Sequence, residues 1–125
     1  MQITHFHPER VRPLSVLVVD DSDDIRARLI RMIQHVEGIS LIAQASDASE
    51  ALRHFDDLHP HAVFLDIHLP DQNGMELLKR IKTWAPSTLV IMLTNHPYME
   101  YRIYCQRHGA DFFFNKFTEF DQAIE

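Results

Sequence analysis

The chain has 125 residues, of which 46% are hydrophobic and 24% charged, and its formal net charge is −6 with the histidines neutral. This length fits one domain with a single core, and the composition excludes disorder throughout. No apolar run approaches the roughly 20 residues that span a bilayer, no basic stripe indicates nucleic-acid binding, and one cysteine, Cys105, excludes an internal disulfide. We therefore expect a cytoplasmic protein that binds neither membrane nor nucleic acid through this segment.

Short apolar runs alternate along the chain with stretches of helical periodicity. The runs that we expect to form strands are 15–19, 40–45, 62–65, 89–93 and 111–114. The stretches that we expect to form helices are 25–36, 51–55, 75–81, 97–108 and 118–125. Gly38 is the expected C-cap of the first helix, and Asp47 with Glu50 three residues later predicts the N-terminus of the second.

Strands that are apolar on both faces favour a parallel sheet with helices on both sides. We therefore predict one doubly wound α/β domain with five strands over residues 14–125, preceded by an N-terminal extension, residues 1–13. Periodicity does not give the strand order. The last helix has room for only about two turns before the chain ends, as expected either for a domain cut from a longer chain or for a short C-terminal helix.

A polar residue follows four of the five apolar runs, and ligands bind at this edge of open parallel sheets. Asp20 and Asp21 follow the first strand, Asp66 the third, Thr94 the fourth and Lys116 the fifth. Each taken singly has a simpler explanation, because aspartates cap helices and every strand must end. Three carboxylates, a hydroxyl and an ammonium at one edge together predict a functional site.

This set of side chains has a chemical meaning. Carboxylates held close together repel each other unless a cation neutralises them. Mg²⁺ accepts one or two carboxylates and leaves positions for phosphate oxygens. A carboxylate at such an ion can attack phosphorus, while Lys116 and Thr94 stabilise the charge on the phosphoryl oxygens. The residues therefore predict phosphoryl transfer to an aspartate.

Four segments carry a resemblance to a known family. They are 16–21 (VLVVDD), 64–74 (FLDIHLPDQNG), 91–94 (IMLT) and 109–116 (GADFFFNK). In this order they resemble the receiver domains of bacterial two-component response regulators of the chemotaxis-regulator type, over residues 15–121. The resemblance implies a flavodoxin-like sheet with strand order 2-1-3-4-5.

The resemblance also implies roles for the acidic residues. Asp66 matches the phosphoacceptor of the family. Asp21 matches the direct Mg²⁺ ligand, and Asp20 matches a second acidic residue that acts through metal-bound water. The backbone carbonyl of His68 would complete the protein ligands of the metal.

The remaining matched positions concern the conformational switch. Lys116 matches the ammonium that contacts the phosphoryl group, Thr94 the hydroxyl that moves towards it, and Phe113 the aromatic rotamer switch. Three features depart from the family pattern, and one of them is the pair of histidines, His68 and His96, that lie two residues beyond Asp66 and Thr94. Phe113 lacks the hydroxyl of the usual tyrosine, and Phe117 replaces the usual proline.

As a receiver, the chain is a signalling switch rather than a metabolic enzyme. Its phosphoryl group would come from a histidine kinase or a phosphotransfer protein. An output domain or downstream protein would bind the face formed by the helix at 97–108, the strand at 111–114 and the last helix. Tyr98, Tyr101 and Tyr104 recur at spacing three on this helix, either as core residues or as part of a partner surface.

Two other functions compete with this reading. In a degenerate receiver the fold would serve as a phosphorylation-independent binding module, which Phe117 favours and the complete acidic set disfavours. A haloacid-dehalogenase-like phosphatase would use Asp21 and Asp23 after the first strand, but that family needs a larger chain. Turnover of an external phosphoester that depends on Asp21 and not on Asp66 would favour the phosphatase.

Overall fold

The computed structural model describes residues 14–95 and 98–116. Its elements are β1 (Leu14–Val19), α1 (Asp23–Ile33), β2 (Ile39–Ala45), α2 (Ala48–Leu58), β3 (Ala62–Asp66), α3 (Gly74–Trp84), β4 (Leu89–Thr94), α4 (Met99–Arg107) and β5 (Phe112–Asn115). Every expected strand is confirmed to within one residue at each end. The predicted extension at 1–13, Phe117 and the predicted last helix lie outside the described residues.

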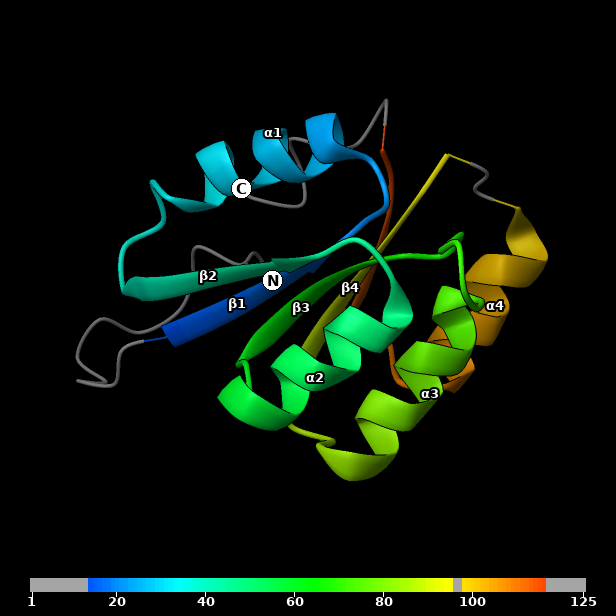
Figure 1. Cartoon of the computed structure of the whole chain (residues 1–125). Helices are drawn as coiled ribbons and strands as arrows, with labels where there is room; N and C mark the ends of the chain where they lie inside the picture. The colour runs from blue at the N-terminus through cyan, green and yellow to red at the C-terminus, as the bar shows by residue number, and fades with distance from the viewer. Residues whose placement is uncertain (1–13, 96–97, 117–125) are drawn as a thin grey trace.

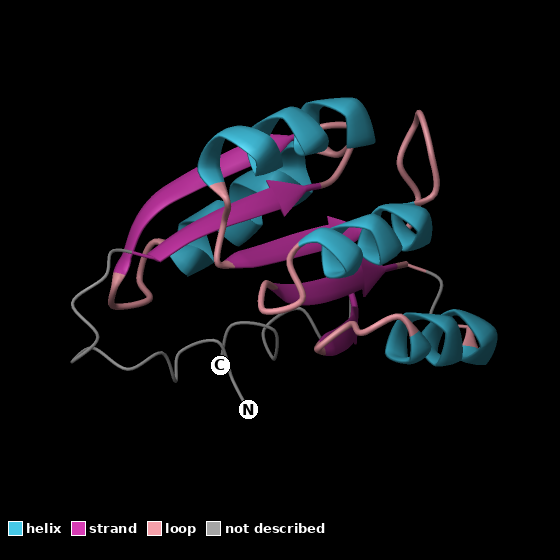
Figure 2. Cartoon of the chain, turned by 90° about the horizontal axis from the view of Figure 1, so that it is seen from below, coloured by secondary structure: helices cyan, strands magenta, loops and turns pink. Residues whose placement is uncertain are grey.

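The strands form one parallel sheet in the order β2-β1-β3-β4-β5. The predicted doubly wound, flavodoxin-like architecture is thus confirmed. Figure 2 shows the strands running in the same direction, so that their carboxyl ends meet at one edge of the sheet. None of the helices in the described part of the chain is long and apolar enough to cross a membrane.

The sheet has a hydrophobic core on each face. Alternate residues of β1 supply both cores, Val16 and Val18 on one face and Leu17 and Val19 on the other. Among the described helices, α1 covers the first face, while α2, α3 and α4 cover the second (Figure 1). These β1 side chains are almost completely buried, and each contributes about 1.5–3 kcal/mol by leaving water. Because both faces are dry, polar groups of the sheet collect at its edges.

The N-terminus of α2 is capped from two places in the chain. Asp47 accepts a hydrogen bond from the Glu50 amide at 2.8 Å, which confirms the predicted cap. Asp71, from the β3–α3 loop, accepts hydrogen bonds from the amides of Ala48 and Ser49 at 2.8 and 3.0 Å. The bond from the Ala48 amide is the main reason why the pKa of Asp71 lies below its ordinary value. The loop that follows β3 is thereby tied to α2.

The prediction that Gly38 caps the first helix is wrong. Helix α1 ends at Ile33, its C-cap is Gln34, and Gly38 lies in the turn before β2 with a φ of +92°. The apolar pattern continues to Val36 because this side chain, although not helical, is buried at 6% exposure. Burial of a turn residue therefore extended the apparent helical periodicity beyond the helix.

We predict that Asp71→Ala lowers the free energy of unfolding by about 1 kcal/mol at pH 7, the usual cost of losing an N-terminal cap. Because folding lowers the pKa of Asp71 below its ordinary value of 3.8, the stabilisation is complete above pH 3.8 and is lost as the pH falls through the folded-state pKa. Urea unfolding of both proteins across this pH range measures the difference.

Asp57→Ala is the matched control, because Asp57 is exposed in the last turn of α2. Loss of a negative charge near a helix C-terminus is neutral or slightly stabilising. Equal stabilities of wild type and Asp71→Ala at pH 7 would contradict the capping role of Asp71.

Candidate functional site

The parallel register brings the predicted site residues to the carboxyl edge of the sheet. Val19 pairs with Leu65, so the residues that follow them, Asp20 and Asp66, sit side by side at the ends of β1 and β3. Thr94 ends the neighbouring strand β4. Four of the five predicted side chains at this edge are buried, and the other is exposed. The buried residues are Asp20, Asp66, Thr94 and Lys116, and the exposed one is Asp21.

Lys116 lies between the two buried carboxylates. Its Nζ is 2.6 Å from Oδ2 of Asp20 and 3.1 Å from Oδ2 of Asp66. Its backbone amide donates to the carbonyl of Thr94 at 2.9 Å, which anchors the residue after β5 to the end of β4. The other oxygen of Asp66, Oδ1, accepts a hydrogen bond from the amide of His68 at 3.2 Å. The structure thus gathers the predicted phosphoacceptor and the predicted ammonium at one point.

The three charges alter the acid–base properties of the site. Burial, and then the negative charge of Asp20, raise the pKa of Asp66 to about 6, although Lys116 and the His68 amide act to lower it. Burial acts to lower the pKa of Lys116, but the hydrogen bond and charge interactions with Asp20 and Asp66 outweigh it, and the pKa of Lys116 is raised. The ammonium therefore only partly compensates two carboxylates that have been removed from water.

Asp20, Asp21 and Asp66 suit a small divalent cation. One carboxylate oxygen from each lies within 4.8 Å of the others. Oδ2 of Asp20 is buried and is contacted by the Lys116 ammonium at 2.6 Å. An all-oxygen set that includes buried carboxylate oxygens matches the preference of Mg²⁺. The predicted carboxylate ligands therefore fit the ion that the sequence analysis expects.

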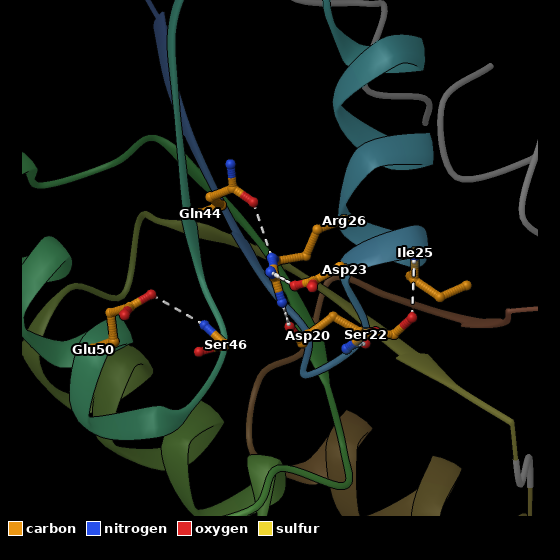
Figure 3. Close-up of polar contacts among 8 residues, drawn as sticks. All are labelled: Asp20, Ser22, Asp23, Ile25, Arg26, Gln44, Ser46 and Glu50. Carbon is orange, nitrogen blue, oxygen red and sulfur yellow. Dashed lines mark hydrogen bonds and ion pairs between the residues drawn. The ribbon is translucent and has the colours of Figure 1, made fainter.

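The β1–α1 turn holds the acidic pair through residues that the sequence analysis did not select. Ser22, rather than an aspartate, is the N-cap of α1, and its hydroxyl accepts from the Ile25 amide at 3.2 Å. The Ser22 amide in turn donates to Oδ1 of Asp20 at 2.9 Å. Arg26 reaches back from α1 to the Asp20 carbonyl at 2.6 Å (Figure 3). Periodicity places Arg26 only on the polar side of a helix and gives no sign of this contact.

Gly74 allows α3 to begin close to the end of β3. Its amide donates to the carbonyl of Ile67 at 2.6 Å. A Cβ at position 74 would lie 2.0 Å from the carbonyl oxygen of Asp66, which is far inside van der Waals contact. The sequence identifies a turn here, but only the packing shows that any larger residue would displace the strand end that carries Asp66.

The two predicted switch residues, Thr94 and Phe113, are both buried. Thr94 is fully buried. Phe113 is 7% exposed, and the guanidinium of Arg102 covers its ring with a separation of 4.6 Å from the ring centroid. The ring of His68 meets Tyr101 edge-on, with 5.8 Å between centroids. Contacts from α4 therefore reach both β5 and the loop after Asp66.

The three tyrosines, Tyr98 at the N-cap of α4 and Tyr101 and Tyr104 within the helix, differ in whether they face the core or the solvent. Tyr98 is 53% exposed, whereas Tyr101 packs against the core on the α2–α4 face of the sheet. The hydroxyl of Tyr104 lies 3.3 Å from the carboxylate of Glu76 and so links α4 to α3. Of these three tyrosines, Tyr98 is therefore the most accessible to a partner, although its ring also meets that of Tyr101 edge-on.

The family model of the response regulator receiver domain matches residues 16–125. The chain belongs to this family. The response regulator domain of CheB from Thermotoga maritima is similar in structure, with a TM-score of 0.77, 34% sequence identity, and coverage of 89% of this chain and 87% of that one. CheY of Borrelia burgdorferi, solved as a CheX–CheY–BeF3–Mg complex, has a TM-score of 0.80 at 27% identity, with coverage of 89% and 84%.

Curated relatives of this receiver are longer proteins. A protein-glutamate methylesterase/protein-glutamine glutaminase of Rhizobium etli is 38% identical over 82 residues, which cover 66% of this chain and 24% of the relative. The transcriptional regulatory protein TrcR of Mycobacterium tuberculosis is 33% identical over 123 residues, which cover 98% of this chain and 47% of the relative. The chain thus spans about a quarter and about half of the relatives that it matches.

We predict that Lys116→Met lowers the free energy of unfolding by about 3 kcal/mol in Mg²⁺-free buffer at pH 8, because it leaves two buried carboxylates without their cation. Saturating Mg²⁺ should recover more stability in this variant than it adds to wild type, because the ammonium no longer competes for the same oxygens. Chemical unfolding with and without Mg²⁺ measures both effects.

Lys82→Met is the control for loss of an ion-paired lysine. Lys82 contacts Asp111 at 2.8 Å, and Asp111 precedes β5 at the opposite edge of the sheet. The gain in stability of Lys82→Met on adding Mg²⁺ should equal that of wild type. If Lys116→Met also responded like wild type, the ammonium and the cation would not share the carboxylates.

Proposed function

We propose that this receiver domain accepts a phosphoryl group on Asp66 from a histidine kinase or a phosphotransfer protein, and that the modification changes the affinity of its α4–β5 face for an output partner. The observation that carries the proposal is the buried Asp66 carboxylate between the Lys116 ammonium and the Asp20–Asp21 pair. Family membership supports the phosphoacceptor role. We place this switch in the cytoplasm.

The chemistry needs a carboxylate nucleophile and stabilisation of the charge on phosphorus. An oxygen of Asp66 forms a bond to phosphorus while the bond from phosphorus to the donor nitrogen breaks, and the imidazole that leaves keeps the electron pair and takes up a proton. The product is an acyl phosphate. Lys116, already within 3.1 Å of Asp66, would contact the new phosphoryl oxygens, and Thr94 would donate its hydroxyl to them.

Asp20, Asp21, Asp66 and the His68 carbonyl would hold a Mg²⁺ ion. When bound, the ion would neutralise the carboxylates and the charge on the phosphoryl oxygens. Lys116, whose Nζ lies 2.6 Å from Oδ2 of Asp20, would share this carboxylate with the ion. The Borrelia relative, solved with BeF3 and Mg, supports this assignment.

The phosphoryl group would add about −1.5 to −2 charges at neutral pH. Lys116 and Thr94 lie at the ends of β5 and β4, so their movement towards this charge would disturb the packing between β5 and α4. Arg102, which covers Phe113 and donates to its carbonyl at 3.4 Å, lies in this contact. The face that changes carries the exposed side chains of Tyr98, Met99 and Ile103.

The geometry does not favour the phosphatase alternative. Asp23, which would act as the second aspartate after β1, is 90% exposed at its side chain and is paired with Arg26. Asp66, by contrast, is buried beside the ammonium. The degenerate-receiver alternative depends on Phe117, which lies outside the described residues.

We predict that incubation with acetyl phosphate or phosphoramidate adds one phosphoryl group to wild type, that the reaction depends on Mg²⁺, and that Asp66→Ala removes it. Intact-mass analysis measures the adduct. Asp24→Asn is the matched control, because Asp24 is an exposed aspartate in the first turn of α1, and it should be phosphorylated like wild type.

An adduct that persists in Asp66→Ala would contradict the assignment of the phosphoacceptor. Absence of an adduct in wild type is examined with beryllofluoride, which mimics the phosphoryl group and reveals a short-lived product. If wild type bound Mg²⁺ but responded to neither reagent, the fold would act as a binding module without phosphorylation.

A further inference from the structure

Arg26 is an arginine of α1 whose side chain is largely buried, at 11% exposure. Its guanidinium reaches three groups from three parts of the chain (Figure 3). Nη1 donates to the backbone carbonyl of Asp20 at 2.6 Å, Nε donates to Oε1 of Gln44 on β2 at 2.9 Å, and Nη2 pairs with the carboxylate of Asp23. All these contacts surround the turn that carries the acidic pair.

The contact with the Asp20 carbonyl also constrains Asp21. The carbonyl oxygen of Asp20 and the amide nitrogen and Cα of Asp21 belong to one planar peptide group. A donor that fixes the oxygen therefore fixes the plane from which the Asp21 side chain projects. Asp21 itself is exposed, so the orientation of this peptide plane is one of the constraints on where its carboxylate lies.

The rest of the turn is already held on its other sides. The Asp20 amide donates to the carbonyl of Ala45 at 3.1 Å, and Oδ1 of Asp20 accepts from the Ser22 amide at 2.9 Å. Without Arg26, the Asp20 carbonyl would lose the hydrogen bond that it accepts at 2.6 Å. Arg26 thus completes the set of hydrogen bonds that gives the turn one conformation.

We propose that Arg26 is a positioning residue for the divalent-cation site, and that it acts by fixing the Asp20–Asp21 peptide plane with Gln44 as its support. This inference rests on the proposed function, because it assumes that Asp20 and Asp21 hold the cation. Groups that orient metal ligands without touching the metal commonly alter affinity about 10- to 100-fold when they are changed.

For this positioning role, the forked arrangement of donors on the Arg26 guanidinium is more important than its positive charge. Three donors on one rigid plane reach a carbonyl, an amide oxygen and a carboxylate simultaneously, which a lysine ammonium on a flexible stem cannot reproduce. Charge alone would have the opposite consequence for the metal, because a positive group near the acidic pair repels a divalent cation. The two effects therefore predict different orders of affinity for Arg26 variants.

The experiment is a Mg²⁺ titration of the whole chain followed by amide NMR shifts, with thermal unfolding to verify that each variant is folded. Arg26→Lys, which keeps the charge and loses the fork, should weaken Mg²⁺ binding about tenfold. Arg26→Met should weaken it as well, although it removes a positive charge. Arg31→Met, which removes an exposed charge from the same helix, is the control and should not weaken binding.

Gln44→Ala tests the same set of contacts from β2, the edge strand, without changing α1. This variant is used if the Arg26 variants do not fold. It should weaken Mg²⁺ binding less than Arg26→Lys does. The double variant should bind no more weakly than Arg26→Lys alone, because Gln44 acts through Arg26.

The results separate this inference from the proposed function. Unchanged Mg²⁺ affinity in Arg26→Lys, or tighter binding in Arg26→Met, overturns the positioning role of Arg26. If the Arg26 variants do not fold, unchanged affinity in Gln44→Ala overturns it instead. Failure of wild type to bind Mg²⁺, or binding that survives Asp21→Asn, instead overturns the metal site of the proposed function. Weaker binding in Arg26→Lys with wild-type affinity in Arg31→Met supports the inference.

Discussion

The burial of two carboxylates beside one ammonium is the constraint on which the site depends. Removing ions from water costs several kcal/mol each unless they are paired, and Lys116 is the partner of both Asp20 and Asp66. One positive charge cannot fully offset two negative ones, and burial with repulsion from Asp20 raises the pKa of Asp66 to about 6. The carboxyl edge of the sheet therefore keeps an excess of negative charge, which a divalent cation can neutralise.

The parallel sheet brings these charged groups together and also keeps water away from the strands that carry them. The register places Asp20, Asp66 and Thr94 at the ends of adjacent strands, and the two hydrophobic cores exclude water from the strands before them. The turns then supply the finer geometry. Gly74 lets α3 approach the carbonyl of Asp66, while Arg26 and Ser22 hold the acidic turn at Asp20.

The loop after Asp66 is connected to two helices. Asp71 ties it to the N-terminus of α2, and the ring of His68 meets Tyr101 on α4. A change of charge at Asp66, as proposed, would act on a segment that contacts both helices through short-range interactions. The longer relatives in which this family of domain occurs include a protein-glutamate methylesterase/protein-glutamine glutaminase and a transcriptional regulatory protein.

The sequence by itself determined the architecture and the predicted members of the site. Continuous apolar runs marked all five strands, and polar residues after them marked the edge at which Asp20, Asp21, Asp66, Thr94 and Lys116 meet. These signals are local, because burial and periodicity act over a few neighbouring residues. The strand order came from the resemblance to receiver domains, since periodicity contains no information about which strands are adjacent.

Only the tertiary structure decided which distant groups support the site. Arg26 meets Gln44, and Asp71 meets the N-terminus of α2, across separations of 18 and more than 20 residues. Such contacts leave no periodic pattern, because each depends on where folding places one side chain. The same reason explains the error at Gly38, where burial of Val36 in a turn resembled another helical turn. The local sequence pattern therefore identified the residues at the carboxyl edge of the sheet, and the tertiary packing determined which contacts hold them in position.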